Sequence, residues 1–306
     1  MNAAASHPSR QRLTGLLLAA GGAALFSFKG IVMKLAFQHG GDVETMMAIR
    51  MALAFPAFAI VGFISARRAH VSPAPRDLGL AAALGLLGYY VCSWLDFTGL
   101  QYISAQLERL VLFLYPTVTA LFAWIFLKDR VTFRHAIALA LSYAGVAVLA
   151  LREYAHVGPD TARGAALVFS AAVLFAVYVT AAKPVIMKLG SPLFTSTVMT
   201  SATVAILIHF AVKGGAIPSD PALWAYGAAL AVFCTVAPSF MLSEAIGRIG
   251  PGLTSAVGGF GPAATAAFAV MLLGEPFGWA QALALVLTVA GVMTLAGGPK
   301  PKPAAD

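Results

Sequence analysis

Charged residues are scarce in this sequence, as are the motifs that nucleotide-driven pumps and metalloenzymes require. Only 10% of its 306 residues are Asp, Glu, Lys or Arg, whereas soluble proteins carry about a quarter. It contains no GxxxxGK[ST] loop for ATP and no HExxH pair for zinc. Its two cysteines, Cys92 and Cys234, lie inside apolar runs and form no CxxC pair, so we expect neither a disulfide framework nor a metal site. The sequence therefore predicts a protein without ATP, metal or cofactor.

Hydrophobic residues make up 60% of the chain, which indicates that lipid is its solvent. An apolar run of about 18 residues or more predicts a membrane span, because a hydrocarbon core of about 30 Å takes roughly 20 helical residues. The sequence predicts an all-α integral membrane protein with ten transmembrane helices. The expected spans are 13–37, 45–65, 78–100, 107–127, 135–151, 164–182, 193–212, 223–246, 252–273 and 277–296.

The positions of the basic residues explain the net charge of +8. They lie in short loops rather than on a basic helix face with interleaved aromatics, so we expect no nucleic-acid partner. With the N-terminus inside, the inner loops and tails hold twelve Lys or Arg and the outer loops three. This positive-inside bias predicts that both termini are cytoplasmic. The inner set is Arg10, Arg12, Arg67, Arg68, Arg76, Lys128, Arg130, Arg134, Lys188, Arg248, Lys300 and Lys302, and the outer set is Arg152, Arg163 and Lys213.

An apolar hairpin occurs twice in the chain. The stretch 107–127 returns at 253–273, and Pro116 aligns with Pro262 at an offset of 262 − 116 = 146. Each copy ends in an acidic turn, at Asp129 and Glu275. Since each half holds five spans, an odd number, the second half is expected to enter the membrane in the opposite orientation. Inverted five-helix repeats are typical of secondary transporters that bind their substrate near the midplane between the repeats.

A second alignment extends the repeat to the start of each half. Lys34 matches Lys183 at an offset of 183 − 34 = 149, so the first span corresponds to the sixth. The predicted organisation is a cytoplasmic tail at 1–12, a first five-helix repeat at 13–151, a linker at 152–163, a second inverted repeat at 164–297 and a cytoplasmic tail at 298–306.

Two segments resemble a known family. LYPTVTALFAWIFLKDR followed by Gly145-Val146, and GPAATAAFAVMLLGEP followed by Gly291-Val292, are similar to the EamA-type transporters of the drug/metabolite transporter superfamily. Asp129 stands where the more usual residue is glutamate. The resemblance implies a multi-pass protein of the bacterial inner membrane that exports small metabolites from the cytoplasm, amino acids and aromatic amino acids among them.

Five charged residues are expected near the outer ends of the first four spans. They are costly in lipid, so they usually face a bundle interior or a water-filled cavity. One interpretation is an ion-pair network that gates the outer mouth, and the other is that the side chains extend to the headgroups. The five are Lys29, Arg50, Asp96, Glu108 and Arg109.

Other residues are candidates for the cavity wall or for hinges. Tyr90 and Trp94 recur at helical spacing, and this stripe either lines a cavity with Tyr178 or packs against other helices or lipid. Pro116 and Pro262 each remove a backbone donor, which makes them either gating hinges or static kinks. The polar candidates for the cavity in the second half are Ser239, Ser243 and Glu244.

Three functions remain open at this point. The first is a secondary transporter that exports amino acids or similar metabolites by alternating access. The second is a drug or amine efflux carrier of the same fold, which is favoured if Glu108 and Glu244 line the cavity. The third is an intramembrane enzyme, but His209 is the one histidine in the interior of a span, and the spans hold no pair of acidic or nucleophilic residues at matching depth.

Overall fold

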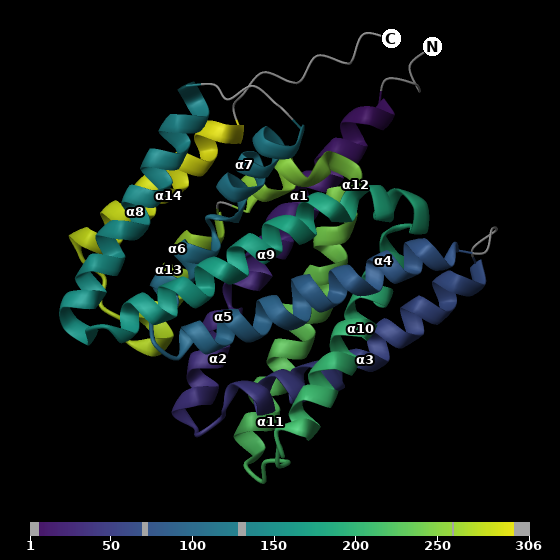
Figure 1. Cartoon of the computed structure of the whole chain (residues 1–306), viewed down its shortest axis with the longest axis horizontal. Coiled ribbons are helices and arrows are strands. Elements are labelled where there is room, and N and C mark those ends of the chain that lie inside the picture. Colours follow the sequence, from purple (N-terminus) through teal and green to yellow (C-terminus); the bar gives the residue numbers. More distant parts are fainter. Residues whose placement is uncertain (1–5, 69–72, 128–132, 259, 297–306) are drawn as a thin grey trace.

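The protein is a bundle of long helices (Figure 1). The computed structural model describes residues 6–68, 73–127, 133–258 and 260–296. Within these ranges, seven helical segments are long and apolar enough to cross a membrane, and 261–273 and 279–294 form two shorter apolar helices. The first half contains α1 (Ser6–Ser27), α2 (Lys29–Gln38), α3 (Val43–Arg68), α4 (Pro75–Gly85), η1 (Leu86–Val91), α5 (Cys92–Leu100), α6 (Ala105–Leu112), α7 (Tyr115–Leu127) and α8 (Phe133–Val157). The second contains α9 (Asp160–Leu189), α10 (Ser191–Val212), α11 (Pro221–Ala231), η2 (Val232–Val236), α12 (Ala237–Val257), α13 (Phe260–Leu273) and α14 (Trp279–Ala296).

Three of the predicted spans are divided. The span predicted at 13–37 breaks at Phe28, and the one at 107–127 breaks at Phe113 and Leu114 between α6 and α7. The one predicted at 252–273 breaks after Val257. Periodicity did not detect these breaks, because the broken segments are as apolar as continuous helices.

The sequence suggested that Pro116 and Pro262 bend continuous helices, but neither proline lies inside one. Pro116 is the second residue of α7 and Pro262 is the third of α13, so each break precedes its proline. The first turn of a helix tolerates proline, because its backbone N–H groups have no intrahelical acceptor there. Both prolines therefore begin a helix rather than kink one.

The predicted linker 152–163 is mostly helical. Helix α8 continues through Val157, and α9 begins at Asp160, so only Gly158 and Pro159 lie between them. Gly158 has φ of 89°, a conformation that favours glycine and allows the chain to reverse in so few residues.

The two halves repeat the same elements at one offset. Pro75 and Pro221 begin α4 and α11, Leu86 and Val232 begin η1 and η2, and α8 and α14 begin 279 − 133 = 146 residues apart. Both η segments are π-turns, which are rare in helices and frequent at functional sites. The structure thus extends the repeat from the matched sequence to the local backbone irregularities.

Equivalent helices α8 and α14 pack against each other and run antiparallel (Figure 1). Ser142 Oγ donates to Thr288 O at 3.5 Å, and Thr288 Oγ1 donates to Ser142 O at the same distance. These partners are 288 − 142 = 146 residues apart. Reciprocal contacts of this kind mark a two-fold relationship, so a pseudo-two-fold axis passes between α8 and α14.

The first helix of each half also packs against a helix of the other half. Helix α1 packs against α12, where a Cβ at Gly15 would lie 2.5 Å from Ile249. Its counterpart α9 packs against α5, where a Cβ at Gly164 would lie 2.9 Å from the carbonyl oxygen of Gly99. Small residues allow such close approach of helices in lipid, and these contacts tie the two halves into one bundle.

The α8–α14 interface gives a first test of the packing. A Cβ at Gly145 would lie 2.3 Å from Thr288 Oγ1 and 2.6 Å from the Ala284 carbonyl oxygen. We expect Gly145→Ala to lower the free energy of unfolding by about 1–3 kcal/mol, measured by thermal unfolding in detergent. Gly79→Ala is the control, because a Cβ there meets nothing within 4 Å and should stabilise α4 by up to about 1 kcal/mol. A Gly145→Ala protein as stable as the wild type would contradict this packing.

Candidate functional site

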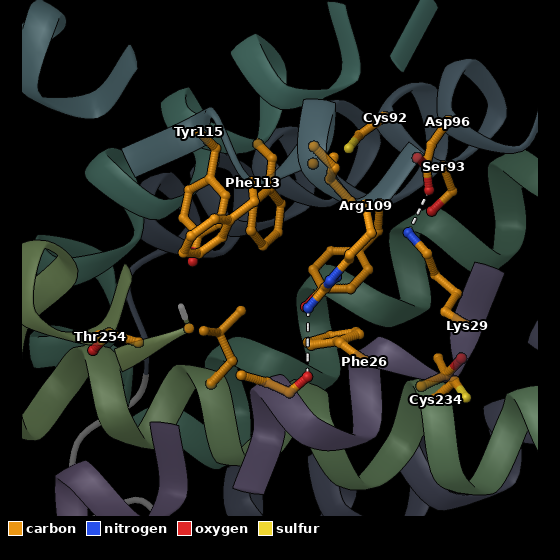
Figure 2. Close-up of a pocket in the computed structure, with 18 of the residues that line it drawn as sticks. Phe26, Lys29, Cys92, Ser93, Asp96, Arg109, Phe113, Tyr115, Cys234 and Thr254 are labelled. Atoms are coloured by element: carbon orange, nitrogen blue, oxygen red, sulfur yellow. Dashed lines mark hydrogen bonds and ion pairs between the residues drawn. The ribbon is translucent and has the colours of Figure 1, made fainter. Parts of the chain in front are cut away.

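A cavity lies between the two halves and is lined by residues of both (Figure 2). Its empty volume is about 850 Å³, including the part open to the outside. Five pairs of its lining residues are equivalent in the repeat: Phe26 and Phe175 at offset 149, and Gly88 and Cys234, Tyr89 and Thr235, Asp96 and Leu242, and Leu112 and Gly258 at offset 146.

The charged residues of the cavity come from the first half alone. Lys29, Arg50, Asp96 and Arg109 line it, whereas their repeat equivalents are uncharged. These equivalents are Tyr178, Met199, Leu242 and Ser255. The cavity therefore has a charged side and a largely apolar side.

Lys29 holds two buried carboxylates together. It is the first residue of α2, and the break at Phe28 precedes it. Its Nζ forms an ion pair with Asp96 of α5 (Figure 2) and lies 3.8 Å from Glu108 Oε1 of α6. Asp96 and Glu108 are each 1% exposed, so these carboxylates lie within the protein and do not extend to the membrane surface. The structure thus brings together three of the five charges predicted at the outer mouth.

Arg50 lies beside this cluster without an ion-pair partner of its own. The residue is 3% exposed, and its Nε and Nη2 atoms form no hydrogen bond. Its guanidinium lies over the ring of Phe97, at 5.0 Å from the centroid, and Lys29 Nζ lies 5.3 Å from the same centroid. Contact with the aromatic face stabilises a cation by about 0.5–2 kcal/mol, which is less than the cost of removing a guanidinium from water.

Arg109 extends from α6 across the cavity (Figure 2). Its Nη2 donates to the carbonyl oxygen of Ala23 in α1 at 3.4 Å, and its Nε has no hydrogen-bond partner. A Cβ at Gly261 would lie 2.3 Å from Arg109 Nη2. This glycine at the start of α13 therefore leaves the space that the guanidinium occupies.

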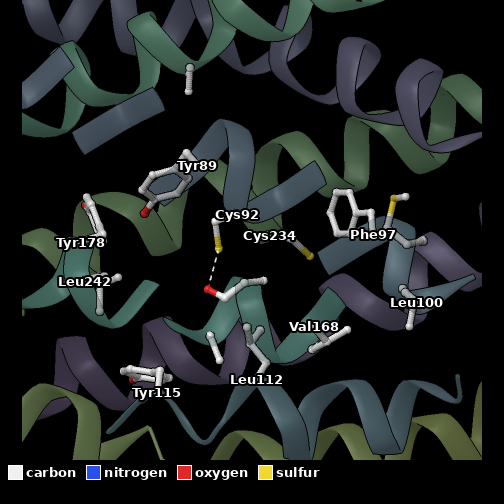
Figure 3. Close-up of a cluster of buried hydrophobic side chains, with 14 of the residues drawn as sticks. Tyr89, Cys92, Phe97, Leu100, Leu112, Tyr115, Val168, Tyr178, Cys234 and Leu242 are labelled. Atoms are coloured by element: carbon white, nitrogen blue, oxygen red, sulfur yellow. Dashed lines mark hydrogen bonds between the residues drawn. The ribbon is translucent and has the colours of Figure 1, made fainter. Parts of the chain in front are cut away.

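Aromatic rings form much of the remaining wall (Figures 2 and 3). Tyr115 meets Phe175 edge-on at 5.0 Å between centroids, and Phe175 stacks with Tyr178 at 5.7 Å. Tyr178 in turn meets Tyr89 edge-on at 5.3 Å. Tyr178, which the sequence analysis placed on the wall, is 1% exposed and lies behind it. Tyr89, Tyr115 and Phe175 line the cavity instead.

The predicted stripe of Tyr90 and Trp94 faces another helix. The Tyr90 hydroxyl lies 3.2 Å from Nδ1 of His209 in α10, and the Trp94 ring is 5.9 Å from the His209 ring. Neither lines the cavity, whereas Tyr89, Ser93 and Asp96 do. Tyr89, Ser93 and Asp96 recur at the same helical spacing as Tyr90 and Trp94, so periodicity alone does not distinguish these two adjacent faces of the span.

The polar candidates of the second half also lie away from the cavity. Ser239 and Ser243 are 0% exposed and do not line it. Glu244 accepts a hydrogen bond from Ser191 Oγ and pairs with Arg248 Nε at 2.7 Å, four residues further along α12. Sequence reasoning missed Thr235, Thr254 and both cysteines, which do line the cavity. Cys234 and Thr235 are the equivalents of Gly88 and Tyr89 at offset 146, so the repeat would have found them only if the face of Tyr89 had been chosen in the third span.

A second, more polar cavity lies at the N-terminal end of α6, and hydrogen bonds between the halves surround it. Glu275, from the turn between α13 and α14, accepts from Ala105 N at 2.7 Å and from Gln106 N at 3.2 Å. Glu153 of α8 accepts from Ser104 N at 3.1 Å. Carboxylates are well placed there, because the N–H groups at the start of a helix lack intrahelical acceptors.

The ion pairs of Lys29 yield a second prediction. Lys29→Gln leaves Asp96 and Glu108 buried without the cation that forms ion pairs with them, and breaking a buried pair in this way costs about 3 kcal/mol or more. We expect a clearly lower melting temperature, and partial recovery in Lys29→Gln/Asp96→Asn, in which one carboxylate is also removed. If Lys29→Gln has the same melting temperature as the wild type, the ion pairs of Lys29 do not contribute to stability.

The hydrogen bonds from Ala105 N and Gln106 N of α6 to Glu275, which we call the Glu275 clasp, yield a third prediction. Glu275→Ala removes the acceptor of two backbone donors, and we expect a loss of about 1.5–3 kcal/mol, as for hydrogen bonds to charged groups. Asp160→Ala is the control: Asp160 is an exposed acidic residue in the first turn of α9, so its loss should cost under about 1 kcal/mol. Equal melting temperatures for the two variants would refute the clasp.

Comparisons with known proteins fit this geometry. Residues 13–151 and 162–297 each match the EamA-like transporter family. The chain is 27% identical over 283 residues to the "Uncharacterized transporter YcbK" of Bacillus subtilis (strain 168), covering 90% of both proteins. It is 28% identical over 222 residues to the "Uncharacterized transporter YyaM" of the same organism, covering 70% of this chain and 72% of that protein.

A solved structure, described only as the crystal structure of a protein, shares the fold. It covers 92% of this chain and 95% of its own, with a TM-score of 0.65 and 17% sequence identity. The family match covers both halves and therefore most of the sequence. This protein belongs to the EamA-like transporter family of the drug/metabolite transporter superfamily, and it is a multi-pass membrane carrier rather than an enzyme.

Proposed function

We propose that this carrier is a secondary transporter that exports small metabolites, above all amino acids including aromatic ones, from the bacterial cytoplasm. It alternates access to the cavity by rocking two inverted five-helix repeats about it. The observation that carries the proposal is the cavity itself, which lies between the repeats and is lined by equivalent residues from both. Secondary transporters with inverted repeats bind their substrates at this kind of interface.

The proposed orientation places both termini in the cytoplasm. The positive-inside bias supports this orientation, and two contacts agree with the order of the spans, because each joins residues assigned to the same end. Lys188 pairs with Asp77 at 2.8 Å, and both belong to the end assigned to the inside. Arg163 lies 4.8 Å from the Tyr102 ring, and both belong to the end assigned to the outside.

Gating roles follow from the same orientation. We propose that Lys29, Asp96 and Glu108, with Arg50 and Arg109, control access from the outer side of the cavity. The Glu275 clasp on α6 then closes the outer end, since those hydrogen bonds join the two halves there. Pro116 and Pro262 lie directly after breaks in the helices, and we propose the breaks as the points at which α7 and α13 pivot.

The rival function is efflux of cationic amines or drugs. It requires acidic side chains on the cavity wall, with Glu108 and Glu244 as candidates. Neither lines the cavity: Glu108 is buried beside Lys29, and Glu244 is paired with Arg248. With three cations and one carboxylate on the wall, the lining favours a solute with an anionic group.

Flux in proteoliposomes tests the proposal. We expect the purified protein to move labelled amino acids, aromatic ones included, across the bilayer, and we expect parallel measurements with and without a pH gradient to identify proton coupling. Lys29→Gln should impair this flux while the protein still inserts, since the cluster lies in the transport path. Protein-free liposomes are the control. The absence of flux for every solute in the panel would overturn the proposal, and unchanged flux in Lys29→Gln would overturn the role of the cluster.

A further inference from the structure

We propose that Arg50, together with Arg109, forms a carboxylate-binding subsite, so that the carrier selects amphipathic solutes by their carboxylate and not by an amine. This inference rests on the proposed transport function and adds the chemical group that the cavity recognises. It starts from the two guanidinium groups on the cavity wall, each of which has at least one buried donor without a hydrogen-bond partner.

Of the two arginines, Arg50 provides the stronger evidence. It lines the cavity, is 3% exposed, and leaves both Nε and Nη2 without a hydrogen-bond partner. A buried charge without a partner is expensive, so natural structures normally pair it. The neighbouring carboxylate of Asp96 pairs with Lys29 through Oδ2, and its Oδ1 forms no hydrogen bond with Arg50. A solute in the cavity can therefore supply the acceptor that Arg50 Nε and Nη2 lack.

Arg109 lines the same cavity and supplies a further donor without a partner. Its Nη2 donates to Ala23 O at 3.4 Å, which is long for a hydrogen bond, and its Nε has no partner. A guanidinium presents its N–H groups as a planar fork that fits the two oxygens of a carboxylate. Two such forks from α3 and α6 are chemically suited to one small anionic group.

The charges around the cavity favour a monoanionic group. Three cations, Lys29, Arg50 and Arg109, accompany two carboxylates, Asp96 and Glu108. If all five are ionised, their sum is 3 − 2 = +1. Lys29 is shared by both carboxylates, so the uncompensated charge belongs to the arginines. One carboxylate from a solute brings the cluster to neutrality, whereas an ammonium ion increases its charge.

The lining also has apolar groups that fit an apolar body. Leu242 stands at the equivalent of Asp96, and Phe175 and Tyr115, which meet edge to face, line the cavity too. A solute with a carboxylate at one end and a ring at the other can place each end against matching groups. The expected class is therefore an aromatic or apolar monocarboxylate, and aromatic amino acids belong to it.

Three related compounds separate carboxylate from amine recognition. Phenylalanine carries both groups, 3-phenylpropionate only the carboxylate, and phenethylamine only the amine. We expect phenylalanine and 3-phenylpropionate to raise the melting temperature of the purified protein, because a ligand that binds the folded state stabilises it. Phenethylamine should produce no shift at the same concentration.

Variants of Arg50 then assign the effect to this side chain. Arg50→Gln should weaken carboxylate binding about ten- to a hundredfold, the range for a lost hydrogen bond to a charged group. Arg50→Lys should weaken it less, since it keeps the charge and loses the fork. Without ligand, Arg50→Gln should melt no lower than the wild type, because it removes an unpaired charge. A purely structural arginine would instead destabilise the protein when replaced.

Arg67→Gln is the matched control. Arg67 also belongs to α3 and lies over an aromatic ring, that of Phe63 at 4.4 Å, but it is exposed and distant from the cavity lining. It should leave carboxylate binding and melting temperature unchanged.

Each outcome decides the proposal. Binding of phenethylamine as tight as that of 3-phenylpropionate, carboxylate binding unaffected by Arg50→Gln, or no binding by any of the three compounds would overturn the subsite. Carboxylate binding that Arg50→Gln abolishes, in a protein that transports nothing in proteoliposomes, would support the subsite and refute the transport function. Flux of amines and amino acids at equal rates would support the transport function and refute the subsite.

Discussion

Backbone groups that leave the helix inside a membrane need hydrogen-bond partners from the protein, because lipid provides none. That constraint accounts for the positions of the helix breaks. At the break between α1 and α2, the carbonyl oxygen of Ser27 accepts from Thr265 Oγ1 of α13 at 2.9 Å. At the break between α6 and α7, Thr117 Oγ1 donates to the carbonyl oxygen of Leu114 at 2.6 Å. The breaks are stable because they lie inside the bundle, beside the cavity and between the halves.

The broken helices in turn place the charges. Lys29 begins α2 directly after one break, and Arg109 belongs to α6, which ends at another. Side chains so positioned point into protein and not into lipid, which is where charges in membrane proteins are usually found. The first half uses these positions for charged residues, while the second half has Tyr178 and Ser255 at the equivalent ones. Duplication thus provided a two-sided cavity, and divergence of the copies made its sides chemically different.

The contacts between the halves are symmetric where α8 meets α14 and asymmetric at the proposed outer end. The reciprocal bonds of Ser142 and Thr288 join α8 to α14 at the axis. At the outer end, Glu275 holds two backbone N–H groups of α6. Its counterpart in sequence is Asp129, which lies outside the described residues. The backbone positions equivalent to Ala105 and Gln106 are Pro251 and Gly252, and proline has no N–H to donate. A copy of the Glu275 clasp with both donors is therefore impossible at that end.

The sequence alone determined that the chain is a helical membrane protein, that it is built from a repeat at offsets 146 and 149, and that charges gather in the first half. Composition, loop charges and the matched prolines suffice for these conclusions, because they depend on hydropathy and spacing. Only the tertiary structure decided which side chains line the cavity. The face of the third span that lines the cavity carries Tyr89 and Asp96 rather than Tyr90 and Trp94, and the break at Phe28 directly precedes Lys29, which pairs with Asp96. Which face meets the cavity and where a helix breaks are set by packing between the halves, which no periodic pattern in a single helix records.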